Sequence, residues 1–342
     1  MTEGLTLETG LPLIWYGIIG IGIFMYVLLD GFVLGIGILF PYAANEEERD
    51  VMMNSVAPIW DGNETWLVLG GAGLFAAFPI AYAIILPALY IPLLAMLLAL
   101  VFRGVAFEFR FKAEKRKRFW NRAFHWGSVV ATFVQGAALG AFIQGFQVAG
   151  RQYIGAAFDW LTPFSLLTGI ALVAGYALLG ATWLMMKTEG AVVERAYRQA
   201  MPLFIAVLVF LACISLWVPF LYPAIAQRWF SWPNIALLAW APVLTTGCSV
   251  LLWLSLRSRA TYAPFIFTMG LFALGYAGLG ISIWPNIVPP DITIWKAASP
   301  PESQIFLLVG VLFLLPIILG YTAYSYWVFR GKIKQGEGYH HH

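Results

Sequence analysis

Five ionisable side chains stand in or beside strongly apolar segments in the first third of the chain: Asp30, Asp61, Glu64, Arg103 and Glu108. Charged side chains are costly inside a bilayer, so those that occur there usually serve a function. Asp30 lies roughly 15 Å from the inner end of its apolar segment at about 1.5 Å per residue, too deep for its short side chain to reach the surface. We interpret it as part of a proton or cation pathway, with a neutral acid bonded to a neighbouring helix as the structural alternative.

Asp61, Asn63 and Glu64 open the next apolar segment, and they have both a structural and a functional interpretation. Asp61 at the N-cap with Glu64 three residues later has the form of a capping box, and acids favour helix N-termini. The same two acids, at the cytoplasmic mouth of a helix, can also collect protons. Asn63 adds a hydrogen-bond donor and an acceptor beside them.

Arg103 lies about two turns inside its own apolar segment and has several candidate partners. It can extend to the inner surface, or pair with Asp61 or Asp30 of a neighbouring helix. Glu108 can join that polar cluster or pair with Lys112 one turn away. The depth of the whole set increases stepwise from the inner edge to Asp30, which is the order that proton delivery from the cytoplasm requires.

The composition indicates the elements that must position these residues. Of 342 residues 61% are hydrophobic and 11% are charged, whereas a soluble domain carries about 25% charged residues. The mean hydropathy is +0.80. These values exclude a water-soluble enzyme, a disordered chain and a nucleic-acid-binding domain. They predict an all-α polytopic membrane protein that forms a single integral membrane domain.

Apolar runs long enough to cross a bilayer predict about nine transmembrane helices. The expected spans are 13–40, 64–79, 82–110, 120–147, 163–187, 201–222, 234–256, 262–284 and 304–330. With the N-terminus outside, Lys and Arg lie on the inner side except Arg103 within a span and Arg151, Arg228 and Lys296 outside. This asymmetry favours an odd number of spans, with the N-terminus out and the C-terminus in. We interpret His340–His342 as a purification tag.

Cofactor ligands are scarce. Haem iron needs an axial His, Cys, Met or Tyr, and His125 is the only histidine before the final three residues. The methionines and the two cysteines form no recognisable spacing with it, and no nucleotide-binding motif occurs. We therefore expect this chain alone to bind neither a metal nor a haem.

Several motifs resemble subunit II of the bd-type quinol oxidases, and the resemblance runs from the first span to the last. The segments that carry it are Asp30-Gly-Phe-Val-Leu-Gly-Ile-Gly, Pro58-Ile-Trp-Asp-Gly-Asn-Glu, Gly70-Gly-Ala-Gly-Leu-Phe, Phe102-Arg-Gly-Val-Ala-Phe-Glu and Tyr321-Thr-Ala-Tyr-Ser-Tyr-Trp. The residues of these motifs look most like those of the cyanide-insensitive branch of this family. One departure is Val33, where many relatives carry a second acid, which puts a path with two acids in the first span in doubt.

The resemblance implies a nine-helix subunit, built as two four-helix bundles plus one helix, in the cytoplasmic membrane of a bacterium. Its implied partner is a haem-bearing subunit I, which holds two haem b groups, one haem d and the quinol site. That complex oxidises quinol and reduces dioxygen to water in an aerobic respiratory chain. Subunit II is implied to stabilise subunit I, to be non-catalytic by itself and to ligate no cofactor. Membrane lipid or a structural quinone between the helices and small single-helix accessory subunits are further partners to consider.

The resemblance also assigns roles to residues. Asp30 and Asp61 carry over as proton-path carboxylates, with Arg103 and Glu108 in the same polar cluster, and Trp60 lies near the partner interface. On this hypothesis cytoplasmic protons enter near Glu108, Asp61 and Glu64, reach Asp30 and cross to the partner.

Two alternatives remain without the resemblance. A proton-coupled secondary transporter fits the composition, the topology and Asp30, although its polar residues would recur in both halves of the chain. Here the charges within spans crowd into the first three. A purely structural scaffold, in which Asp30 is a buried hydrogen-bonding acid, differs only in whether protons use this chain.

Overall fold

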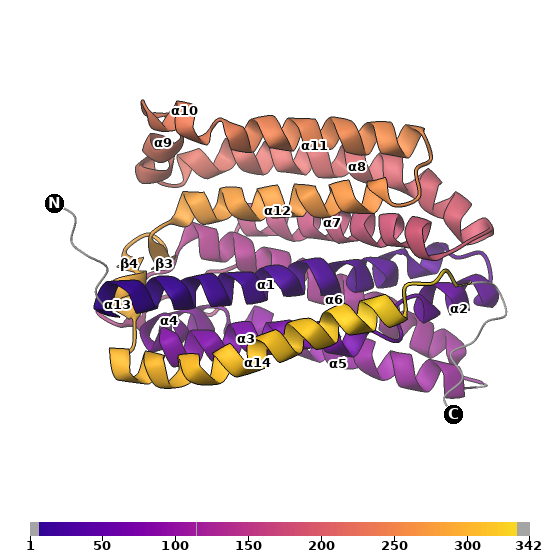
Figure 1. Ribbon diagram of the computed structural model, residues 1–342, viewed down its shortest axis with the longest axis horizontal. Helices are drawn as coiled ribbons and strands as arrows, with labels where there is room; N and C mark the ends of the chain where they lie inside the picture. Colours follow the sequence, from indigo (N-terminus) through magenta and orange to yellow (C-terminus); the bar gives the residue numbers. More distant parts are fainter. Residues whose placement is uncertain (1–6, 114, 334–342) are drawn as a thin grey trace.

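The computed structural model describes residues 7–113 and 115–333. The proposed tag His340–His342 and Lys334 of the inner charged set lie outside the described residues. Long helices run along one common axis, with short connections at both ends (Figure 1). Within these described ranges, eight helices are long and apolar enough to cross a membrane. The chain is an all-α, multi-pass membrane protein.

The first half of the described chain contains these elements: α1 (Leu7–Leu39), η1 (Phe40–Tyr42), α2 (Glu46–Asn54), α3 (Trp60–Ala77), α4 (Pro79–Ala88), α5 (Tyr90–Lys112), α6 (Lys117–Gln144), β1 (Val148–Ala149) and β2 (Gln152–Tyr153). The second half contains α7 (Pro163–Lys187), α8 (Ala191–Trp217), η2 (Val218–Phe220), α9 (Pro223–Phe230), α10 (Asn234–Leu238), α11 (Trp240–Arg257), α12 (Ala263–Ile283), β3 (Asn286–Val288), β4 (Ile292–Thr293), α13 (Ile294–Ala297) and α14 (Pro301–Val328).

The long helices form two layers (Figure 1). Helices α1, α3, α5 and α6 make the first bundle, and α7, α8, α11 and α12 make the second. Helix α7 packs against both α1 and α6, which joins the two bundles. Helix α14 returns to the first bundle and packs on α3 and α1. This arrangement matches the expected two bundles and one last helix.

Helix α1 is the centre of the molecule because every residue from Asp30 to Phe40 is buried. Its crossing with α7 depends on Gly35 and Gly180. A Cβ atom on Gly35 would lie 2.7 Å from the carbonyl carbon of Tyr176 and 2.8 Å from the backbone nitrogen of Gly180. These distances are too short for any side chain, so the two backbones touch directly, as small-residue spacing in membrane helices allows.

The helices differ from the expected spans at three places, one of which is 234–256, divided between α10 and α11. Helix α3 is not among the eight apolar candidates, because its first five residues include Asp61, Asn63 and Glu64. The range 82–110 is divided between α4 and α5, which are separated at Leu89. Pro79 starts α4, Pro87 lies in its last turn and Pro92 in the first turn of α5, and proline supplies no backbone donor to a helix.

Short elements close the two ends of the bundles. One end carries the hairpins β1–β2 and β3–β4 with α9 and α13, and the other carries α2 (Figure 1). Arg228 lies on α9, Lys296 on α13 and Arg151 between β1 and β2. The structure therefore gathers the three outer cations at one end, while the orientation of that end in a membrane stays a prediction.

Candidate functional site

Arg103 joins three helices of the first bundle inside the apolar core. Its Nη1 donates to Asp30 Oδ1 of α1 at 2.5 Å, and its Nη2 donates to Glu64 Oε1 of α3. The side chains of Arg103 and Asp30 are fully buried, whereas that of Glu64 is 32% exposed. Two carboxylates from different helices thus share one guanidinium. Of the partners expected for Arg103, Asp30 is bonded to it and Asp61 is not, and Glu64 is a second partner that was not expected from the sequence.

Aromatic and small residues hold Arg103 in this place. Trp60 stacks on Phe107 with ring centroids 4.8 Å apart, and the Arg103 guanidinium carbon lies 5.8 Å from the Trp60 ring. On the other side, α6 approaches the backbone of α5 at Gly127. A Cβ there would lie 3.0 Å from the backbone nitrogen of Arg103. Arg103 is therefore enclosed between α3 and α6.

Several buried polar atoms around the cluster have no hydrogen-bond partner among the described residues. They are Asp30 Oδ2, Arg103 Nε and the hydroxyl of Tyr26. Tyr26 lies one helical turn before Asp30 on α1. Buried polar groups are normally satisfied, and the Tyr26 hydroxyl is close enough to Asp30 for the two side chains to interact.

Asn63 lies on the face of α3 that packs against α1 and α14, and it is almost fully buried. Its Nδ2 donates to Leu29 O at 2.8 Å, and its Oδ1 accepts from the hydroxyl of Tyr326 on α14 at 3.0 Å. Tyr326 also lines a cavity of about 300 Å³ at the end of the bundle, whose walls include Trp183, Lys187 and Asn54. Tyr326 therefore connects the wall of this cavity to Asn63.

Asp61 and Glu108 do not reach the cluster. Asp61 is exposed, and its side chain makes no ion pair or hydrogen bond within the described part of the chain. Glu108 is also exposed and pairs with Lys112 at 3.6 Å. The capping-box interpretation is wrong, because α3 begins at Trp60 with Ile59 as an N-cap that makes no side-chain bond, and Glu64 is bonded to Arg103 instead.

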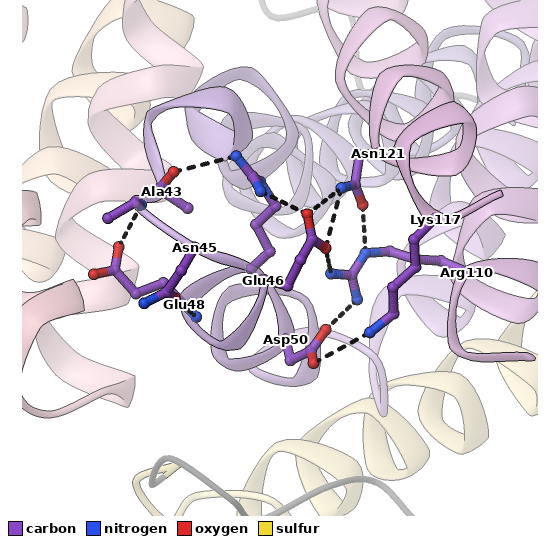
Figure 2. Close-up of polar contacts among 10 residues, drawn as sticks. Ala43, Asn45, Glu46, Glu48, Asp50, Arg110, Lys117 and Asn121 are labelled. Atoms are coloured by element: carbon purple, nitrogen blue, oxygen red, sulfur yellow. Dashed lines mark hydrogen bonds and ion pairs between the residues drawn. The ribbon is translucent and has the colours of Figure 1, made fainter. Parts of the chain in front are cut away.

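A second polar group lies at the α2 end of the bundle, and sequence reasoning missed it. We call Glu46, Asp50, Arg110 and Asn121 the clasp. Figure 2 shows the two acids of α2 pointing toward Arg110 of α5 and Asn121 of α6. The fully buried Arg110 side chain donates to Glu46 Oε2 at 3.0 Å, to Asp50 Oδ1 and to Asn121 Oδ1 at 2.6 Å.

The opposite side of α2 is bonded to the second bundle. Arg195 of α8 contacts Glu48 at 3.0 Å, and Glu48 also accepts from the backbone nitrogen of Ala44. Burial alone raises the pKa of Glu48, but the bond from Ala44 and the bond and charge of Arg195 outweigh it and lower that pKa. Glu46 has a lowered pKa for the same reason, through Asn121, Arg49 and Arg110 acting against burial. Helix α2 therefore links both bundles through ionised carboxylates.

No group of three or more His, Cys, Asp or Glu side chains lies where it could hold a metal within residues 7–113 and 115–333. His125 has its Nδ1 2.9 Å from Gly37 O, and no second histidine occurs in these ranges.

Comparison with known proteins identifies the family of this chain. The family model for cytochrome bd terminal oxidase subunit II matches residues 11–329. The chain is 30% identical to cytochrome bd-I ubiquinol oxidase subunit 2 of Escherichia coli K12, with 96% of each chain covered. It is also 30% identical to cytochrome bd ubiquinol oxidase subunit 2 of Bacillus subtilis 168, with 95% of this chain and 97% of that protein covered.

A solved structure agrees with these relatives. The structure of bd oxidase from Geobacillus thermodenitrificans matches with a TM-score of 0.77 and 18% identity, over 93% of this chain and 98% of that chain. At that identity the likeness concerns the fold. The chain belongs to the family of cytochrome bd terminal oxidase subunit II, and it is therefore a subunit of a respiratory oxidoreductase complex rather than a secondary transporter.

Proposed function

We propose that this chain is the haem-free subunit II of a quinol:oxygen oxidoreductase, and that it stabilises a haem-bearing subunit I and contributes a proton path to it. The observation that carries this proposal is the Asp30–Arg103–Glu64 cluster. Three ionisable side chains meet inside an apolar bundle, two of them fully buried. Such a cluster is costly in a membrane, so a proton-handling role explains it better than packing does.

The face around Glu64 is the part of the chain that we assign to subunit I. Glu64 and Asp61 lie one turn apart on α3, and residues one turn apart share a helix face. Glu64 is 32% exposed although its helix is otherwise apolar after the first turn. A carboxyl group facing lipid is strongly disfavoured, so the partner subunit covers this face. Trp60, at the start of the same helix, lies at its edge.

The proton path follows from these positions. Protons enter from the cytoplasm at Asp61, reach Glu64 and the Arg103–Asp30 pair, and leave toward the partner. The position of Glu108, exposed beside Lys112, supports only a role in attracting protons to the entrance. The haems, two of type b and one of type d, and the quinol site belong to subunit I, where quinol oxidation and oxygen reduction occur. Lipid or a structural quinone between the helices completes the subunit in the bacterial cytoplasmic membrane, with small single-helix accessory subunits as further partners.

Oxygen consumption by the purified complex tests the path. Asp30→Asn keeps the size of the side chain but removes its charge, and we expect it to slow quinol-driven oxygen consumption while the haem absorption spectrum stays intact. Glu302→Gln is a matched control, because Glu302 is an exposed acid in the first turn of α14. Unchanged turnover in an assembled Asp30→Asn complex would refute the path through this chain. The same preparation tests the partnership, since a haem-bearing subunit should co-purify.

A further inference from the structure

We propose that the Asp30–Arg103–Glu64 cluster holds one exchangeable proton and that this proton resides on Glu64, while Asp30 stays ionised as the fixed counter-ion of Arg103. The inference rests on the proposed proton path and deepens it. It changes the role of Asp30 from a relay that protons pass through to a positioning residue.

The cluster carries an excess of negative charge. Arginine stays protonated in proteins, so with both acids ionised the three side chains carry a net charge of −1. The nearby hydroxyl groups of Tyr26, Tyr176 and Tyr326 and the amide of Asn63 add no positive charge, and Asp61, one turn before Glu64 on α3, adds a further negative one. An uncompensated buried charge is far costlier than the uptake of one proton. One of the two carboxyl groups is therefore protonated.

Burial and bonding separate the two acids. Asp30 is fully buried and bonded to Arg103 at 2.5 Å, and a guanidinium at that distance favours the ionised form of a carboxyl group. Its other oxygen, Oδ2, is also buried, so no solvent-exposed atom of Asp30 can exchange a proton. Glu64 bonds Arg103 through Oε1 only and is 32% exposed. Glu64 can bind and release a proton at its outer edge while the Asp30–Arg103 pair stays intact.

The proton can reach the cluster from one of two sides. Tyr326 lines the cavity of about 300 Å³ at the α2 end, and its hydroxyl is bonded to Asn63. The Asn63 amide donates in turn to Leu29 O, and an amide held at both ends does not relay protons. The open side is the outer face of α3, where exposed Asp61 precedes Glu64 by one turn. Exchange with Glu64 therefore takes place over that face, which is the face assigned to subunit I.

Infrared difference spectroscopy of the whole complex in light and heavy water locates the proton, because a protonated carboxyl group has its own stretching band. We expect one such band from the cluster at neutral pH. Glu64→Asp should move it, Glu64→Gln should abolish it, and Asp30→Glu should leave its position unchanged. Haem absorption confirms assembly of each variant, and Glu302→Gln is the control for general effects of losing an acid. A band that moves with residue 30, or one that persists in Glu64→Gln, would overturn the inference.

Turnover separates this inference from the proposed function. We expect Glu64→Gln to slow oxygen consumption by roughly a hundredfold, the lower end of what a positioned proton-transfer group contributes, with partial recovery in Glu64→Asp. If the band moves in Asp30→Glu while Asp30→Asn and Glu64→Gln both turn over slowly, the proton path stands and the proposed location of the proton is wrong. If the band follows residue 64 while turnover is unchanged in every variant, the location is correct and the path through this chain is wrong.

Discussion

Replacing Arg110 tests whether the clasp stabilises the fold. Arg110→Met keeps the length and apolar contacts of the side chain but removes three bonds, to Glu46, Asp50 and Asn121. A hydrogen bond to a charged group contributes about 1.5–3 kcal/mol when buried, but exposed ion pairs contribute only about 0–1 kcal/mol. Glu46 and Asp50 are 41% and 34% exposed, so we discount their bonds and expect a total loss of about 3 kcal/mol.

The assay is thermal unfolding of the detergent-solubilised complex. Shifts of about 2–4 °C per kcal/mol are typical of domains with 150–250 residues and become smaller in larger ones, so we expect a midpoint roughly 5 °C lower. Arg118→Met is the matched control, since Arg118 is an exposed cation near the start of α6. The double variant with Glu46→Gln should lose less than the sum of the two single losses. A midpoint equal to that of Arg118→Met would refute the reasoning.

Two further predictions concern pH and packing. Because the pKa values of Glu46 and Glu48 are lower in the folded chain than their ordinary value of 4.5, the unfolded chain binds more protons between the two values, and stability falls as pH drops below about 4.5. Acid unfolding curves should show this loss, and Glu46→Gln should make it smaller; a curve of unchanged steepness would contradict it. Gly35→Ala should cost about 1–3 kcal/mol, as overpacking does, or prevent assembly, because its Cβ would contact the α7 backbone. Gly17→Ala on the same helix meets no atom within 4 Å, so equal thermal midpoints for these two variants would refute the packing argument.

The sequence predicts the features that hydrophobicity alone determines. It located the long helices and singled out Asp30, Arg103 and Glu64, because charges inside apolar runs are conspicuous. It could not choose the partner of Arg103, since that depends on how α1, α3 and α5 meet in space. The capping interpretation of Asp61 and Glu64 failed for a related reason. The ion pair between Arg103 and Glu64 is a tertiary contact, which local spacing does not reveal.

The residues that sequence reasoning missed share one property. Tyr326 is one of several aromatic residues near the end of α14, and nothing local distinguishes it from a residue at the membrane surface. Its bond to Asn63 joins positions 263 residues apart. Glu46, Asp50 and Arg110 likewise resemble ordinary charges in a cytoplasmic loop until α2 folds back against α5 and α6.

The contact between Asn63 and Tyr326 also depends on the order in which the chain is synthesised. Helix α14 is the last helix that the structure describes, and the ribosome makes it after both bundles. Until it inserts, the Asn63 amide oxygen lacks the Tyr326 hydroxyl, and the flank of α3 and α1 that α14 covers stays open. A chain that lacks α14 therefore keeps all three members of the charge cluster but leaves the flank of α3 and α1 beside Asn63 uncovered.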